Sequence, residues 1–214
     1  MKYAILIKII LITSLYISFL SARPISYKDS WTVISNNDYF RNSVLIHYSP
    51  KSTYSTGFIS QYWQEKKYWI NAFNLNYLVK RINRKSSQAN LYLKGGVGML
   101  STNYNSNDKN ELVYYNKLAA DWETRKHLVS YENSFIKPTS IKNTYMQKFR
   151  IGKAPYVAKY GELHTWLIYE LVHIPDRSSK YISNFILRLF KSTNLIEIGL
   201  DEDKTTSLNF IKRF

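Results

Sequence analysis

The chain has 214 residues, a formal net charge of +15 at pH 7 and no cysteine. This length is enough for one domain or one barrel, and the lack of cysteine excludes a disulfide framework, a thiolate metal site and a cysteine nucleophile. The basic balance favours attraction to anionic partners, but no run of five or six like charges concentrates it. A compositional preference for lysine, asparagine and isoleucine is therefore the favoured explanation, and no nucleic-acid partner is expected.

Residues 1–22 have the pattern of a secretory signal peptide. They begin with basic residues, continue with an uncharged apolar run over 9–20, and end with the small residues Ser21 and Ala22. The apolar run is shorter than the roughly 20 residues that a helix needs to cross a bilayer. We therefore predict a cleaved signal peptide at 1–22 and a single domain at 23–214. An uncleaved N-terminal anchor is the alternative.

The rest of the chain alternates polar and apolar side chains in segments that turn residues separate. Successive side chains of a strand point to opposite faces, so this alternation predicts strands with one apolar and one polar face. In chain order, the predicted strands cover residues 31–35, 44–48, 54–63, 69–82, 88–100, 112–124, 127–136, 145–154, 163–173, 181–189, 195–200 and 208–214. Pro50 is expected to end the second strand. The most polar tract, 101–110, is the best candidate for a long external loop.

The segment 88–100, QANLYLKGGVGML, shows this pattern most clearly. It is about 13 residues long, whereas strands usually have about 5–6. Gly95, Gly96 and Gly98 lie inside it, where glycine permits bending and close approach of neighbouring chains. A long, bent strand with two different faces is typical of a transmembrane β-barrel, which has lipid outside and water or packed polar groups inside.

The regular spacing of the segments predicts an all-β fold. After residue 22 the chain has no apolar run long enough for a membrane helix, and many of its 19 tyrosines and 5 tryptophans lie near segment ends, as interfacial aromatic girdles do. We therefore predict a transmembrane antiparallel up-and-down β-barrel of about twelve strands, with ten as the alternative count. A secreted soluble β-sandwich that binds a partner is the alternative fold.

The chain ends in NFIKRF. Phe214, with Phe210 and Leu208 in phase, resembles the C-terminal signal that bacterial outer-membrane barrels present to their assembly machinery. Lys212 departs from that pattern, because an apolar or aromatic residue is usual there. The resemblance implies location in the outer membrane, with the barrel-assembly machinery, outer-membrane lipids and lipopolysaccharide as partners.

Whole segments are also similar to a family of small uncharacterised outer-membrane proteins of Gram-negative bacteria. They are DSWTV at Asp29, HYSP at His47, LNYLVKR at Leu75, SQANLYL at Ser87, ADWETR at Ala120, MQK at Met146, APYVA at Ala154 and GELHTWL at Gly161. The resemblance covers nearly the whole chain after the signal peptide. It implies a fold and a location, but no activity.

If the apolar strand faces point to lipid, charged side chains of both signs point into the lumen. The predicted lumen set is Lys80, Lys94, Asp121, Glu123, Glu132, Lys148, Arg150, Glu170, Arg188, Glu197 and Arg213. Buried charges must be paired or hydrated, because each otherwise costs several kcal/mol. We expect a cross-strand network of ion pairs that largely fills the lumen; a polar lining for small solutes is the alternative.

One weak catalytic pattern is present. The spacing His47-Tyr48-Ser49 places a histidine base and a serine on one face of a strand, as the His-x-Ser pair of outer-membrane lipid A deacylases does. The match lies near the N-terminus, whereas that family carries the pair near its C-terminus, and Pro50 follows at once. No histidine spacing suits a metal site, and neither a metal nor a cofactor is expected.

The sequence therefore favours an integral outer-membrane barrel with a structural or narrow-pore role, and an enzyme is not favoured. A lipid-modifying enzyme, a small-solute channel and the soluble binding module remain as alternatives, and the oligomeric state is open.

Overall fold

The computed structural model describes residues 27–102, 109–159 and 161–214, so the predicted signal peptide lies outside the described residues. The described residues form twelve strands: β1 (Ser30–Asn37), β2 (Arg41–Lys51), β3 (Tyr54–Trp63), β4 (Tyr68–Asn83), β5 (Ser87–Thr102), β6 (Lys109–Thr124), β7 (His127–Pro138), β8 (Thr144–Lys153), β9 (His164–His173), β10 (Tyr181–Lys191), β11 (Asn194–Asp201) and β12 (Thr206–Arg213). Among these residues, no helix is long and apolar enough to cross a membrane.

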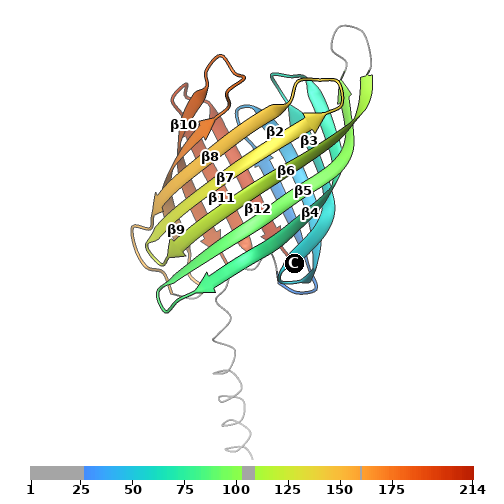
Figure 1. The fold of residues 1–214 in the computed structure, drawn as a ribbon. Helices are drawn as coiled ribbons and strands as arrows, with labels where there is room; N and C mark the ends of the chain where they lie inside the picture. Colours follow the sequence, from blue (N-terminus) through green and yellow to red (C-terminus); the bar gives the residue numbers. More distant parts are fainter. Residues whose placement is uncertain (1–26, 103–108, 160) are drawn as a thin grey trace, which may run out of the picture.

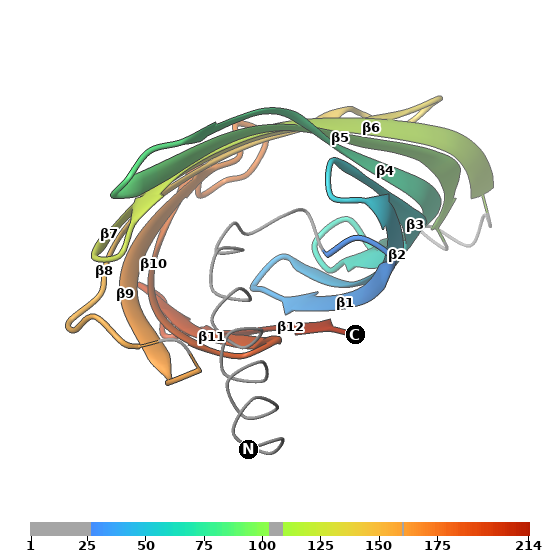
Figure 2. The same cartoon turned by 90° about the horizontal axis from the view of Figure 1, so that it is seen from below.

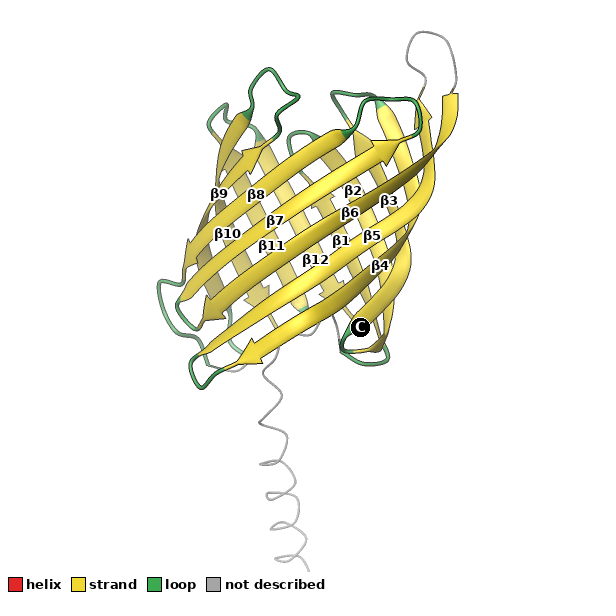
Figure 3. Cartoon of the chain, viewed as in Figure 1, coloured by secondary structure: helices red, strands yellow, loops and turns green. Residues whose placement is uncertain are grey.

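Each strand pairs antiparallel with the next, and β1 pairs with β12, so the sheet closes into a barrel. Figure 1 shows the tilted strands of the wall, Figure 2 shows the closed ring from below, and Figure 3 shows strands and short connections throughout the described part. The prediction of a twelve-strand up-and-down barrel is confirmed. The ten-strand count and the soluble β-sandwich are wrong.

β4 shows why the alternating sequence forms this wall. Along most of its length, exposed and buried side chains alternate. On the outer face, Phe73 and Leu75 are 71% and 54% exposed, whereas Asn74 and Asn76 on the inner face are almost completely buried. An apolar outer face and a polar inner face suit a strand between lipid and lumen.

Aromatic side chains mark both borders of the apolar outer surface. Trp31 at the start of β1 and Trp122 near the end of β6 are exposed at one border, and Trp69 and Tyr181 are exposed at the other. This is the arrangement of interfacial aromatic girdles.

The structure differs from the predicted strands mainly at their ends. β2 continues through Pro50 to Lys51, because the ladder shifts register between Tyr48 and Lys51, and proline is tolerated at such irregularities. The predicted loop 101–110 is shorter than expected: β5 extends to Thr102 and β6 begins at Lys109. Its central residues, 103–108, lie outside the described part of the chain.

The two ends of the barrel differ. At the end that we call the terminal end, β1 begins and β12 ends, and the connections cover 52–53, 84–86, 125–126, 154–163 and 192–193. At the opposite end, the loop end, the described connections cover 38–40, 64–67, 139–143, 174–180 and 202–205. All connections at the terminal end except 154–163 have only two or three residues, whereas those described at the loop end have three to seven.

Candidate functional site

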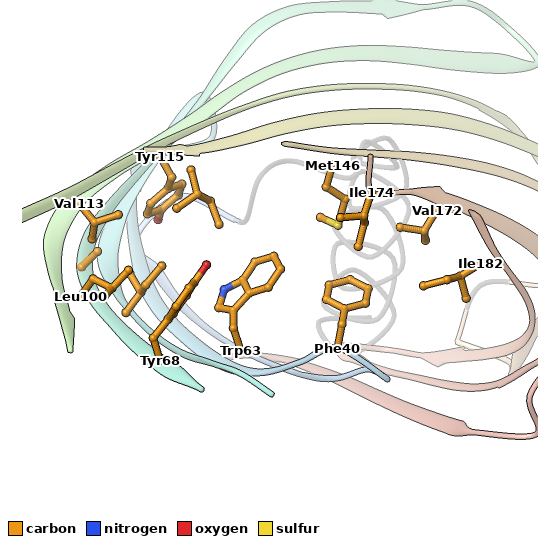
Figure 4. Packing of buried hydrophobic residues seen from close by; sticks show 13 residues of the cluster. Phe40, Trp63, Tyr68, Leu100, Val113, Tyr115, Met146, Val172, Ile174 and Ile182 are labelled. Carbon is orange, nitrogen blue, oxygen red and sulfur yellow. The ribbon is translucent and has the colours of Figure 1, made fainter. Parts of the chain in front are cut away.

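The candidate site is the lumen, and its loop end is filled by apolar side chains. We call this cluster the loop-end seal; its members are Phe40, Trp63, Tyr68, Ile70, Ala72, Leu100, Val113, Tyr115, Ile136, Met146, Val172, Ile174 and Ile182. Figure 4 shows these side chains reaching from the Leu100 and Val113 side of the wall to the Val172 and Ile182 side. Each is at most 9% exposed, so they pack as a core inside the barrel.

A row of aromatic rings crosses the seal. The ring of Phe40 lies 5.6 Å from that of Trp63, which lies 6.1 Å from that of Tyr68. Phe40 comes from the β1–β2 connection, so this connection folds over the lumen rather than away from it. The backbone amides of Phe40 and Arg41 both donate to a carboxylate oxygen of Asp38, which fixes the turn.

Arg41 and Tyr39 join the seal to the polar lumen. The Arg41 guanidinium pairs with Asp38 at 3.4 Å and lies 5.5 Å and 5.6 Å from the rings of Phe40 and Trp63, within cation–π range. Burial, and to a lesser degree the Glu170 carboxylate, raises the pKa of Tyr39, so its phenol stays neutral.

Next to the seal, basic and acidic side chains of β8 to β11 form a continuous band of ion pairs. Glu170 pairs with Lys148 at 3.3 Å and with Arg150 at 2.5 Å. Arg150 also contacts Glu197 at 3.3 Å, and Glu197 pairs with Arg188 at 2.6 Å. Each side chain in this band is at most 15% exposed. The band thus holds two carboxylates among three cations on one side of the lumen.

A cavity of about 430 Å³ occupies the remaining lumen. Its lining includes Tyr115 of the seal, and also Asp38, Arg41 and Ser207 from the loop end. Toward the other end, its lining reaches Glu123, Leu128 and Arg213, which lie within two residues of the ends of their strands at the terminal end. The cavity is therefore a polar vestibule that runs along the lumen beside the seal.

The structure places ten of the eleven predicted lumen residues on this cavity; they are Lys94, Asp121, Glu123, Glu132, Lys148, Arg150, Glu170, Arg188, Glu197 and Arg213. Lys80 is the exception and is exposed on the outer face. The β4–β5 ladder shifts register between Leu78 and Lys80, and one extra residue reverses the alternation. Arg81 faces inward instead and donates to Asn90, which donates to Asp121.

The predicted lumen set omits other residues that line the cavity. Lys117 pairs with Glu132 at 2.8 Å, and it could have been included because it shares the polar face of β6 with Asp121 and Glu123. Arg41 and Asp38 could not have been predicted as lumen residues. They lie between the predicted strands, and the fold of the β1–β2 connection turns them inward.

His47 and Ser49 share the inner face of β2, as their spacing predicts, and are 2% and 0% exposed. Neither His47 Nδ1 nor Ser49 Oγ has a hydrogen-bond partner among the described residues. Within the described part of the chain, the pair therefore lacks the hydrogen-bonded acidic residue that orients the histidine in Ser–His–Asp triads.

The terminal residues complete the wall. β12 pairs with β1 from Leu208 to Arg213, and the backbone amide of Phe214 donates to the Trp31 carbonyl at 2.9 Å. The side chains of Leu208, Phe210 and Phe214 are 52%, 37% and 70% exposed, so the predicted phase of the terminal pattern places all three on the lipid side.

Within the described part of the chain, no group of three or more His, Cys, Asp or Glu side chains is placed to hold a metal ion.

No protein-family model matches the chain, and no curated protein matches it. Among solved structures, it is similar to a KdgM porin, with a TM-score of 0.50 and 9% identity over 86% of this chain and 98% of that one. A structure described as a KdgM porin in complex with disordered oligogalacturonate gives a TM-score of 0.49 and 10% identity over the same shares.

At this identity the similarity concerns the fold. Only helices and closed barrels satisfy every backbone hydrogen-bonding group within a bilayer, and this barrel is closed, apolar outside and bordered by aromatic girdles. The chain is an integral β-barrel of the bacterial outer membrane. Its fold, a closed barrel of twelve strands, is similar to that of a KdgM porin.

Proposed function

We propose that this barrel has a structural or narrow-pore role and conducts little or nothing across the membrane. The observation that carries the proposal is the loop-end seal, since packed apolar side chains occupy the loop end of the lumen and leave only the polar vestibule beside them. Water and ions cross such a constriction poorly, because an apolar passage cannot replace the hydrogen bonds that they lose.

The ion pairs support the same proposal. Seven basic and six acidic side chains line the vestibule, so its charge is nearly balanced. Long Arg and Lys side chains that reach a carboxylate on another strand occupy space and hold neighbouring strands together. In this proposal, paired charges and the apolar seal together fill most of the lumen.

A small-solute channel is the second candidate, and the polar vestibule of about 430 Å³ favours it. In that case the seal is a gate and the vestibule is the entry for solutes. A lipid-modifying enzyme has less support, because His47 Nδ1 has no hydrogen-bond partner among the described residues to orient the ring as a base.

We also propose that the terminal end faces the periplasm, because outer-membrane barrels have short periplasmic turns and longer extracellular loops. The loop end would then meet lipopolysaccharide. Phe214 at the end of the closing strand suits recognition by the barrel-assembly machinery.

Solute flux into proteoliposomes tests the seal. The unmodified barrel should admit a small sugar hardly faster than protein-free vesicles. Replacing Phe40 and Trp63 together with alanine removes two of the three rings that cross the lumen, so flux should rise at least severalfold. The matched control replaces Phe73 and Phe185 with alanine. Their exposed rings face lipid, so this control should leave the flux unchanged.

Rapid sugar entry through the unmodified barrel would contradict the proposal and favour the channel. An unchanged flux in a Phe40 and Trp63 variant that still folds, as judged by its heat-dependent gel mobility, would show that the rings do not close the lumen.

A further inference from the structure

The excess positive charge of the chain gathers at the terminal end. The vestibule is nearly balanced, and the described connections at the loop end carry six basic and five acidic side chains. The connections at the terminal end carry five basic side chains and one acidic side chain. Net charge in the described part of the chain is therefore distributed unevenly along the barrel axis.

Outward lysines at the strand ends add to this excess. Lys80 on β4, Lys153 on β8 and Lys191 on β10 are all exposed on the outer face near the terminal end. They border the lipid-facing surface directly, since Val79 and Ile151 beside them are 48% and 50% exposed. The apolar belt thus ends in ammonium groups on strands from different parts of the ring.

Most exposed cations in the connections form no ion pair. At the loop end, Lys142 pairs with Asp176 at 2.8 Å and Arg177 pairs with Glu65 at 2.9 Å, whereas Lys67, Lys180 and Lys204 pair with no described residue. None of the three outward lysines at the terminal end forms an ion pair with a described residue, and the same holds for Arg84, Lys85 and Lys126 in the neighbouring connections. These six residues, which we call the basic ring, therefore lack counter-charges within the described protein.

We propose that the basic ring binds the headgroups of anionic phospholipids in the leaflet next to the terminal end. A lysine at the edge of an apolar surface lays its methylene chain along the lipid tails and extends its ammonium group to the headgroup phosphates. Near an anionic membrane surface, each basic side chain contributes a factor of about fivefold in affinity, which corresponds to about 1 kcal/mol. Several such contacts around the barrel enrich anionic lipid at its perimeter.

The position of the ring favours lipid over a soluble polyanion. Three of its members project outward from the wall at the border of the apolar belt, where headgroups lie, rather than toward the mouth of the vestibule. The proposal depends on the membrane location of the barrel and is independent of whether the lumen conducts.

The test compares how strongly spin-labelled phosphatidylglycerol and phosphatidylcholine associate with the folded barrel in phosphatidylcholine vesicles. One variant replaces Lys80, Lys153 and Lys191 with glutamine. The matched control removes three exposed cations from the loop end with Lys67→Gln, Lys137→Gln and Lys180→Gln. Heat-dependent gel mobility confirms that each protein is folded.

We expect the unmodified protein to prefer phosphatidylglycerol severalfold at low salt, with a smaller preference at high salt. The terminal-end variant should lose most of the preference, and the loop-end control should keep most of it. No preference in the unmodified protein, or an equal preference in it and the terminal-end variant, would overturn the proposal. Equal losses in both variants would also overturn it, because they would reflect net charge alone. Retention of the detergent-folded protein by soluble polyphosphate, without any lipid preference, would indicate a soluble partner instead.

Discussion

At the scale of single residues, the lumen is shaped by side chains that face inward, and one extra residue decides which ones do. Ten predicted lumen residues follow from simple alternation, but the register shift after Leu78 sends Lys80 outward and Arg81 inward. A β-bulge depends on backbone geometry and partner strands, and nothing in the composition of this segment marks its position. The sequence also predicts that the glycines of β5 permit close approach of neighbouring groups. At Gly96 the ring of Tyr115 lies against the strand, and an added Cβ would come within 2.7 Å of that ring.

Ser49 belongs to this scale, because its hydroxyl is fully buried and has no partner among the described residues. Replacing Ser49 with alanine should therefore leave folding intact, since no hydrogen bond is lost. It should also remove no lipid A or phospholipid hydrolase activity, because we expect none in the unmodified protein. Mass spectrometry of both lipids after incubation with purified protein checks this. Hydrolysis that disappears in the Ser49→Ala variant would establish an enzyme.

At the scale of elements, strand number and order follow from the sequence because each strand alternates and each turn is polar. The prediction of 54–63 agrees fully with β3, and the others differ from the structure by a few residues at their ends. The inward fold of the β1–β2 connection could not be predicted. Phe40 follows a polar turn and carries no periodic signal, and only packing against Trp63 explains its burial.

The ion-pair band joins four strands, and Glu170 lies at its centre. Glu170→Ala should lower the free energy of unfolding by more than about 1 kcal/mol, because it leaves Lys148 and Arg150 without their shared carboxylate. Glu65→Ala breaks the more exposed pair with Arg177 and should cost between about 0 and 1 kcal/mol. Urea unfolding in lipid vesicles, followed by gel mobility, measures both. Equal losses would show that the band does not stabilise the barrel.

The closing strand gives a prediction about assembly. Deleting Phe214 should lower the folded yield in cells severalfold, because the last strand closes the barrel and presents the proposed signal to the insertion machinery. Refolding in detergent should suffer less, because the deletion removes one backbone hydrogen bond at the end of the β1–β12 ladder. Phe214→Tyr, which keeps an aromatic ring, is the control. An unchanged cellular yield after the deletion would show that the insertion machinery does not depend on Phe214.

At the scale of the whole molecule, the lumen is packed differently at the two ends of the barrel. A barrel of eight strands is filled by its own side chains, whereas porins of 16–18 strands leave an aqueous channel. Twelve strands lie between these cases, and here apolar side chains pack inside the loop end while a polar vestibule runs beside them. The sequence could indicate the charges of the lumen, but not this arrangement, because the seal combines residues from ten different strands and connections.

The most direct test of the closed lumen is the single-channel conductance of the unmodified protein in a planar bilayer. A lumen that the loop-end seal closes to ions predicts no steps, or only small and brief ones, at moderate voltage in molar salt. Large, stable steps of uniform size would contradict the account, because they require a continuous aqueous path past Phe40, Trp63 and Tyr68.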